Sequence, residues 1–495
     1  MRRSGRRCFY AIIAIALAYI IISGVISRFT KGRHQDPIFD LENKDWVASS
    51  GSWADRAACN YFGICGAFHL FTRTHGGQIP NALPSTNNHS EYWSSGRPGD
   101  WSEEEKQLRE IPQYIFDHAP YVHLSSREQF WPTDLAEHLT HTSPHLGYEM
   151  ILEEHSNGST ILHELNEIAG GLGGHNVYLA SNDDLSQWPS WLTGATNIPG
   201  PGNVRLDVTD TPDGPPAKPT LRHHQELRKR ALKSSSETSE RQLREVPSGR
   251  STAPAFLIVV PKEDGIVDAF WFFFYSFNHA QKVINIQFGN HIGDWEHTLI
   301  RFRNGKPQYV SLSEHHFGAA YAWDAIEKYL PTDDGAMVGT RSNETATELA
   351  KRPVVYSAVG SHAMYATPGH HPYILPWDLL HDDTDRGPLW DPTLNLHSYT
   401  YDLQTIRAST RNPSTPTGWF DFAGRWGDKY FKLSDPRQYR FAGQYHYMNG
   451  PYGPKAKFLN RKEPCQGPGI KKCQIKEWVG DERPKRLHSS NSDQN

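Results

Sequence analysis

The sequence has few cysteines and methionines and almost no net charge. Cys and Met number five each in 495 residues, whereas Trp, Tyr and Phe number 15, 22 and 22. Lys and Arg total 51 and Asp and Glu total 55, which gives a net charge of −4 and argues against a dedicated nucleic-acid binder. No repeat of fixed period is present either. We therefore expect a loop-rich globular protein with an aromatic core and no nucleic-acid partner.

Long apolar runs are also scarce, and one stands out. Residues 8–27 contain no charged side chain and are long enough to cross a bilayer as a helix. We predict a cytosolic N-terminus at 1–7 and a transmembrane signal anchor at 8–28. The body would be lumenal, as in a single-pass type II membrane protein of the endomembrane system. The alternative is a signal peptide that is cleaved after Ser27.

The cysteines outside this run are even in number, which suits an oxidising lumen. Their close spacing suggests the pairs Cys59–Cys65 and Cys465–Cys473, although four cysteines allow three connectivities and a zinc site is the competing interpretation. Glycosylation sequons stand at Asn88, Asn157 and Asn343.

The chain between these landmarks divides by composition. Residues 29–110 are polar and read as a stem or lid, in which Ser102 begins a capping box before a short helix. Residues 111–458 form the main domain, and 459–495 form a C-terminal tail. Residues 204–252 are rich in Pro and charge and predict a disordered insertion. Its basic run at 228–230 would suit a processing protease, and a tolerated surface loop is the alternative.

Strand signals dominate the main domain. The apolar and aromatic segments 255–260, 267–277, 307–313 and 353–359 are bounded by turn residues, and Asn304-Gly305 is a strong hairpin signal. We predict a mainly β fold, an antiparallel β-sandwich core with short helices and long loops beside the N-terminal transmembrane helix.

The densest chemical cluster is FGNHIGDWEHTLIRF at 288–302. Strand alternation puts Asp294 and Glu296 on one face, and a nearby turn could bring His291 to the same point. One His and two carboxylates suit a hard divalent cation, Mg²⁺, Ca²⁺ or Mn²⁺. The alternative is a buried salt-bridge network, in which the cation comes from one of three side chains: Arg301, Arg303 or Arg425.

Two further clusters offer neighbours for this site. Ser361 and His362 are adjacent at the end of a strand, without the G-x-S-x-G elbow of a serine hydrolase, so we expect His362 to face the Asp294 site instead. The segment GRWGD predicts a tight turn that buries Trp426 and offers Arg425 to a carboxylate.

Several of these segments together resemble a known family. The run from IPQYIFDHAPYVHL to HTSPHL, then HIGDWEHTLIRF, YSAVGSHAMYATPGHHPY, GRWGD and GPYGPK, resembles the fungal vacuolar protein sorting-associated protein 62 family over about 111–458. The resemblance implies a role in delivering proteins to the vacuole and an N-terminal membrane anchor. It does not imply a biochemical activity.

A weaker likeness concerns the metal hypothesis. The heptapeptide of the necrosis-inducing NLP-type toxins is similar to residues 291–296, and its metal ligands would fall on His291, Asp294 and Glu296. A second His of that motif is replaced by Gly293, and a further Asp would fall near Asn278. The likeness implies a β-sandwich whose cation engages a sugar headgroup.

The leading hypothesis is a non-enzymatic, membrane-anchored lumenal protein of vacuolar sorting, with a glycan or the sorting machinery as partner. The alternatives are a metal-dependent hydrolase of glycans or lipid headgroups, in which Asp294 or Glu296 is the base, and a cation-assisted glycan-binding module.

Overall fold

The computed structural model describes most of the predicted main domain and part of the stem. The described residues are 37–70, 101–151, 162, 165–168, 174–207, 243–283, 286–315, 318–331, 333, 336–340, 350–373, 380–466 and 473–479. The predicted anchor at 8–28 and the sequons at Asn88, Asn157 and Asn343 lie outside them. Within the described ranges, no helix combines the length and apolar character that crossing a bilayer requires.

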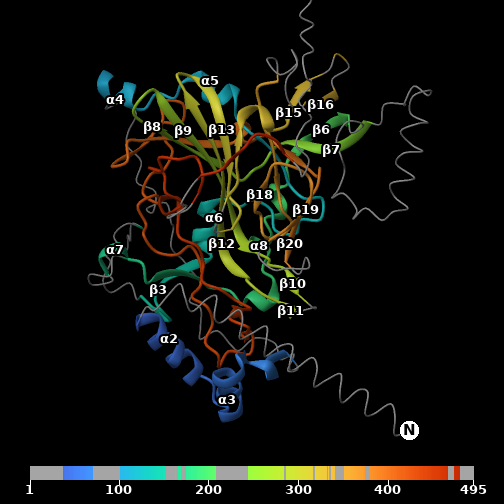
Figure 1. Cartoon of the computed structure of the whole chain (residues 1–495). Coiled ribbons are helices and arrows are strands. Elements are labelled where there is room, and N and C mark those ends of the chain that lie inside the picture. The colour runs from blue at the N-terminus through green and yellow to red at the C-terminus, as the bar shows by residue number, and fades with distance from the viewer. Residues whose placement is uncertain are drawn as a thin grey trace, which may run out of the picture.

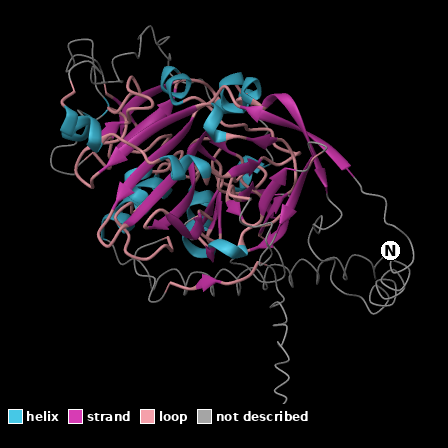
Figure 2. Ribbon diagram, turned by 90° about the horizontal axis from the view of Figure 1, so that it is seen from above, coloured by secondary structure: helices cyan, strands magenta, loops and turns pink. Residues whose placement is uncertain are grey.

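Two eight-stranded sheets form the body (Figures 1 and 2). The strands of the first sheet are, in spatial order, β23 (Ile406–Ala408), β22 (Leu396–Tyr401), β8 (Ala255–Pro261), β9 (Ile266–Asn278), β12 (His291–Arg303), β13 (Lys306–Leu312), β14 (Ala320–Ala322) and β26 (Ile475–Lys476). Those of the second are β15 (Lys328–Pro331), β16 (Ala336–Thr340), β6 (Gly200–Asp207), β7 (Leu243–Arg250), β21 (Leu389–Trp390), β2 (Tyr121–His123), β17 (Val354–Ser357) and β18 (Met364–Tyr365).

The remaining elements are short. The small strands are β1 (Ile64–Cys65), β24 (Arg440–Phe441), β25 (Gln444–Tyr445), β3 (Thr142–Leu146), β4 (Glu149–Met150), β5 (Val177–Ser181), β10 (Lys282–Val283), β11 (Ile286–Gln287), β19 (Gly369–Pro372) and β20 (His381–Thr384). The helices are α2 (Pro37–Ala48), α3 (Trp53–Phe62), α4 (Glu103–Leu108), α5 (Gln113–Asp117), α6 (Leu135–Thr140), α7 (Leu165–Ile168) and α8 (Ser190–Thr193). In Figure 1, α2 and α3 lie at the end of the molecule opposite α4 and α5.

The two sheets pack face to face through one apolar core. Trp271 and Phe273 of β9 meet Trp390 of the second sheet, and the rings of Phe273 and Trp390 lie 5.2 Å apart. The other face of the first sheet is also covered, since Phe272 and Trp295 pack under the irregular C-terminal chain. Burial on both faces explains why β9 reads as a continuous aromatic run and not as an alternation.

Short sequence patterns predicted the start of one helix and the position of one hairpin correctly. The side chain of Ser102 accepts the N–H of Glu105 at the start of α4, as the capping box predicts. The Asn304-Gly305 turn joins β12 to β13 with positive φ at both residues, 50° and 76°. Such angles match the twist of the flanking strands. The prediction of a mainly β fold with short helices is therefore confirmed.

The prediction of an antiparallel β-sandwich core is correct for the hairpin pairs but wrong for part of both sheets. Five strand pairs in the described residues run parallel: β22–β8, β14–β26, β16–β6, β21–β7 and β17–β2. The partners of each pair are far apart in sequence, so no hairpin signal announced them. One of them also joins residues 475–476 of the predicted tail to the first sheet.

The predicted insertion at 204–252 is wrong at both ends. Strands β6 and β7 pair over eight positions, from Gly200 with Arg250 to Asp207 with Leu243. Val204, Leu206 and Val246 alternate with polar residues. They pack in a separate apolar cluster of the second sheet. Burial of these three side chains stabilises the two strands. The charged residues that alternate with them give the segment the composition of a disordered region. Residues 208–242 lie outside the described residues.

The described part of the stem is tied to the C-terminal chain. The indole N–H of Trp46 donates to the carbonyl of Phe431 at 2.8 Å, and β1 pairs with β24. The disulfides Cys59–Cys65 and Cys465–Cys473 are both present, as the spacing suggested.

These disulfides predict a thiol count. After unfolding without reduction, the full chain should expose one reactive thiol, that of Cys8, because the other four sulfurs are bonded. Each short disulfide loop should contribute roughly 2–3 kcal/mol to the free energy of unfolding. Mass spectrometry after alkylation measures the number, and five alkylated cysteines in secretory-pathway material would contradict the pairing.

Candidate functional site

Asp294 and Glu296 lie side by side on β12 and face the space between the two sheets. They share the parity of Ile300 and Phe302, which belong to the core between the sheets, whereas Trp295 packs on the opposite face. The alternation predicted for this strand is therefore confirmed. The two residues are only 6% and 4% exposed, so their charges need partners inside the protein.

His362 is the partner of Asp294. It lies in the turn between β17 and β18, with a left-handed φ of 56° that a non-glycine residue seldom adopts. Its ring Nδ1 donates to Asp294 Oδ2 at 3.0 Å, and its Nε2 donates to the carbonyl of Phe130 at 3.0 Å. The carbonyl can only accept, and Asp294, whose lowered pKa keeps it ionised, also only accepts, so both ring nitrogens carry hydrogen. The fully buried ring is therefore an imidazolium.

Two further groups hold this cation. Glu128 Oε2 lies 3.8 Å from Nε2 of His362 and accepts the N–H of Gly360 at 2.8 Å. The ring of Tyr275 stacks on the imidazole, with centroids 3.7 Å apart and planes 4° from parallel. Burial alone would lower the pKa of His362, but the charges of Glu128 and Asp294 and their hydrogen bonds raise it to about 10. The pKa of Asp294 is correspondingly held below its usual value, against the effect of burial.

The second buried carboxyl group, that of Glu296, is stabilised in a different way. Its carboxyl group hydrogen-bonds to the hydroxyl of Ser313, which also accepts the N–H of His297 at 2.7 Å. Burial raises the pKa of Glu296 to about 8, and the charge of Asp294 acts in the same direction. At neutral pH Glu296 therefore retains its proton, so Asp294 carries the charge of this pair and lies beside the positive charge of His362.

The remaining predicted ligand and neighbours are used elsewhere. His291 Nδ1 donates to the carbonyl of Gly293 at 2.7 Å, and Asn278 donates to the carbonyl of Gly289 at 3.1 Å. Among the described residues, His291, Asp294 and Glu296 do not form a group whose ligand atoms all lie within 4.8 Å of one another.

Two of the three arginines predicted as alternative partners have other partners, and the third, Arg303, is exposed at the end of β12. Arg425 donates to the carbonyl of Gly450 at 2.8 Å and lies over the ring of Tyr452. Arg301 binds Asp268 on the opposite side of the strand at 2.7 Å. The network interpretation is thus supported, but its cation is His362 and not an arginine.

Gly293 explains why the likeness to the toxin heptapeptide stops at that position. Its φ is +68°, and a Cβ there would lie 2.0 Å from the carbonyl oxygen of Trp426. Neither the second His of the toxin motif nor any other side chain fits. The close approach of Trp426 to β12 instead packs its indole against Trp295, on the face of the first sheet that points away from the second sheet.

The Ser361-His362 pair is not a nucleophile with its base. Ser361 donates to Asp382 Oδ1 at 2.6 Å, whereas His362 turns to Asp294. Adjacent residues of the turn thus serve two separate carboxylates. The prediction that His362 faces the Asp294 site is confirmed.

Sequence reasoning missed Glu128, Tyr275 and Ser313. Glu128 stands in a polar loop, and Tyr275 within an aromatic run that looked wholly structural. Tyr275 is directly opposite Asp294 on the neighbouring strand, which a register drawn through the two aromatic strands would have indicated. Nothing local marked Glu128.

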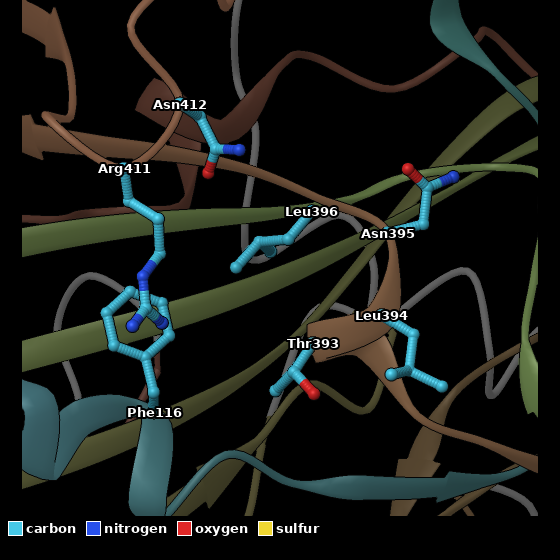
Figure 3. Close-up of a pocket in the computed structure, with 7 residues that line it drawn as sticks. All are labelled: Phe116, Thr393, Leu394, Asn395, Leu396, Arg411 and Asn412. Carbon is cyan, nitrogen blue, oxygen red and sulfur yellow. The ribbon is translucent and has the colours of Figure 1, made fainter.

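A separate cavity of about 280 Å³ opens near α5 (Figure 3). The guanidinium of Arg411 lies across the ring of Phe116, 3.8 Å from its centroid. The lining amides are engaged, since Asn395 donates to Thr252 O at 2.7 Å and Asn412 accepts from Ser398. No carboxylate is among the lining residues, which are Phe116, Thr393, Leu394, Asn395, Leu396, Arg411 and Asn412.

Comparison with known proteins identifies two relatives in Saccharomyces cerevisiae. The putative vacuolar protein sorting-associated protein TDA6 is 34% identical over 425 residues, which are 83% of this chain and 77% of the relative. Vacuolar protein sorting-associated protein 62 is 34% identical over 387 residues, 74% of this chain and 71% of the relative. No family model and no solved structure matches the chain.

The raised pKa of Glu296 predicts a pH effect on stability. An unfolded Glu ionises near pH 4.5, whereas the folded residue keeps its proton to about pH 8. Between these values the folded state binds more protons, so this residue's contribution to stability falls as pH rises. The variant Glu296→Gln should therefore gain stability relative to wild type from pH 5 to 8. Urea denaturation at several pH values measures the difference, with Glu103→Gln on the surface as control. A difference that does not change with pH would refute this account.

Gly293 predicts a second effect. Gly293→Ala should lower the free energy of unfolding by roughly 3 kcal/mol or more, from left-handed strain and overlap with Trp426. Gly443 is the matched control, since its φ is +79° but a Cβ there meets nothing within 4 Å. Gly443→Ala should cost only about 1–2 kcal/mol. Equal losses in denaturant titrations would mean that the contact with Trp426 does not matter.

Proposed function

Since this chain belongs to the family of vacuolar protein sorting-associated protein 62, we propose that it acts in the delivery of proteins to the vacuole as a membrane-anchored lumenal protein. The similarity to the two yeast relatives across most of the chain is the observation that carries the proposal. The partner would be a glycan or a component of the sorting machinery.

A lumenal position is supported by the cysteines. Both disulfides join residues close in sequence, and such bonds persist in the secretory pathway. The uncharged run at 8–27 would supply the anchor, with residues 1–7 in the cytosol and the body in the lumen. Asn88, Asn157 and Asn343 would then be accessible to glycosylation.

A non-enzymatic role is supported by the state of the Asp294 cluster. A hydrolase needs its acid and base beside an accessible cleft. Asp294, Glu296 and His362 are at most 6% exposed, and they already form hydrogen bonds with one another, with the hydroxyl of Ser313 or with the backbone. The cluster is better suited to holding the two sheets together than to turning over a glycan or a lipid headgroup.

Binding of Mg²⁺, Ca²⁺ or Mn²⁺ by His291, Asp294 and Glu296 stays a prediction. Such a cation would have to displace the proton of Glu296 and draw in His291, whose Nδ1 contacts its own loop. It would also face the positive charge of His362 at 3.0 Å from the Asp294 carboxylate.

The proposal predicts rescue of a sorting defect. In yeast cells that lack both relatives, a soluble vacuolar hydrolase should be partly secreted, and expression of this chain should return it to the cells. Immunoblots of medium and cell extract measure the secreted fraction. Carbonate extraction of the same cells should leave the chain in the membrane pellet, with its body protected from added protease.

The control replaces residues 1–28 by a cleavable signal peptide, which leaves the described fold intact but removes the anchor. Loss of rescue in this variant supports a role for anchoring. Failure of the intact chain to rescue, despite normal abundance and topology, would contradict the sorting role. Release by carbonate would contradict the anchor alone.

A further inference from the structure

The hairpin of β19 and β20 has two chemically different faces. The strands pair antiparallel, with His370 opposite Asp383 and His371 opposite Asp382. Because side chains alternate along a strand, His370, Asp383 and His381 share one face, and His371 and Asp382 share the other.

The face with Asp382 is fixed to the body of the protein. The fully buried Asp382 accepts hydrogen bonds from Ser361 at 2.6 Å and Tyr365 at 2.8 Å, and contacts His315 at 2.7 Å. His371 stacks on the ring of Tyr365, with centroids 3.9 Å apart. These contacts hold the position of the hairpin, and therefore also of the side chains on its other face.

That other face gathers three metal-ligating groups. His370 Nδ1 donates to Asp383 Oδ1 at 2.7 Å, and the rings of His370 and His381 lie 4.0 Å apart. One ligand atom from each of the three residues lies within 4.8 Å of the other two. All three side chains are half-buried, so an ion would be partly shielded from water yet could be reached from it.

Arg127 orients the carboxylate of this group. Its Nη2 donates to Asp383 Oδ2 at 2.9 Å, which leaves Oδ1 directed at His370. A group that binds the outer oxygen of a metal-ligating carboxylate in this way fixes the direction of the other oxygen. The Arg127 side chain is 61% exposed, so water screens its repulsion of a cation.

We propose that His370, His381 and Asp383 bind one Zn²⁺ ion. Two imidazole nitrogens and one carboxylate oxygen are a common ligand set for zinc, whereas Mg²⁺ and Ca²⁺ prefer oxygen ligands alone. Ligands at zinc distances lie about 3.3 Å apart in a tetrahedron. The three ligand atoms, which lie within 4.8 Å of one another, would adjust to that spacing as the ion replaces the proton between His370 and Asp383.

The three residues leave the fourth tetrahedral position to water or to a donor group of another molecule. The ion would also link β19 to β20 across the hairpin, as His370 comes from one strand and the other two ligands from the next. This site is separate from the Asp294 cluster and does not depend on the sorting role.

Zinc binding to the full chain tests the proposal. Purified protein is stripped with EDTA, desalted and titrated with ZnCl₂, and bound zinc is measured by elemental analysis. We expect the wild type to bind one ion. Either His381→Gln or Asp383→Asn should lower the affinity for zinc at least about 100-fold, since even the loss of an outer-shell partner changes metal affinity 10–100-fold. Zinc should raise the melting temperature of the wild type but not that of these two variants. Co²⁺ in place of zinc should give the visible spectrum of a tetrahedral site.

The matched control is His141→Gln. His141 Nδ1 lies 3.4 Å from Asp183 Oδ2 in another half-exposed pair, which does not belong to a group of three metal-ligating side chains among the described residues. Its loss should leave zinc binding unchanged. Using two ligand variants keeps the test valid if one fails to fold, as judged by metal-free melting. No zinc bound by the wild type, equal binding by both ligand variants, or displacement by a modest excess of Mg²⁺ or Ca²⁺ would overturn the proposal.

Discussion

The imidazolium of His362 joins three parts of the fold. It binds Asp294 of the first sheet, the carbonyl of Phe130 in the loop after β2, and through Gly360 and Glu128 it fixes the turn of the second sheet. Each partner alone would be a buried acceptor or charge with a high desolvation cost. Together they satisfy both ring hydrogens of His362, so the relative position of the two sheets is coupled to one protonated side chain.

Close backbone packing supports the other side of the first sheet. Gly293 lets the chain at Trp426 approach β12, and a Cβ on Gly427 would lie 2.0 Å from the carbonyl of Ile292. This approach brings Trp426, Trp419 and Trp295 into one aromatic cluster. The irregular segment after β23 is ordered in this way by packing, and it makes the first sheet buried on both faces.

The charged groups described above fall into a buried set around Asp294 and a solvent-accessible set on the hairpin of β19 and β20. In the buried Asp294 cluster, the positive charge of His362 faces the carboxylates of Asp294 and Glu128, and Glu296 keeps its proton. On the hairpin of β19 and β20, one strand directs Asp382 inward and Asp383 outward. This division gives the proposed sorting protein a stable body and leaves groups such as Asp383 accessible from solvent.

The sequence by itself determined the features that depend on near neighbours. The alternation along β12, the Asn304-Gly305 hairpin, the Ser102 cap and the two disulfides follow from spacing within a few residues. The burial of the aromatic strands was also visible, because such runs are too apolar for a surface. Asp294 and Glu296 were placed on one face of β12 in the same way.

Only the tertiary structure decided which groups neutralise the buried charges and how the sheets are ordered. His362 and Asp294 are 68 residues apart, and Phe130 is 232 residues from His362. The parallel pairs and the paired arms at 200–207 and 243–250 likewise join segments that no short pattern connects. A residue's local sequence fixes its face and its backbone preference. Its protonation and its partner depend on burial and on charges brought near by the fold, and for these the chain carries no local signal.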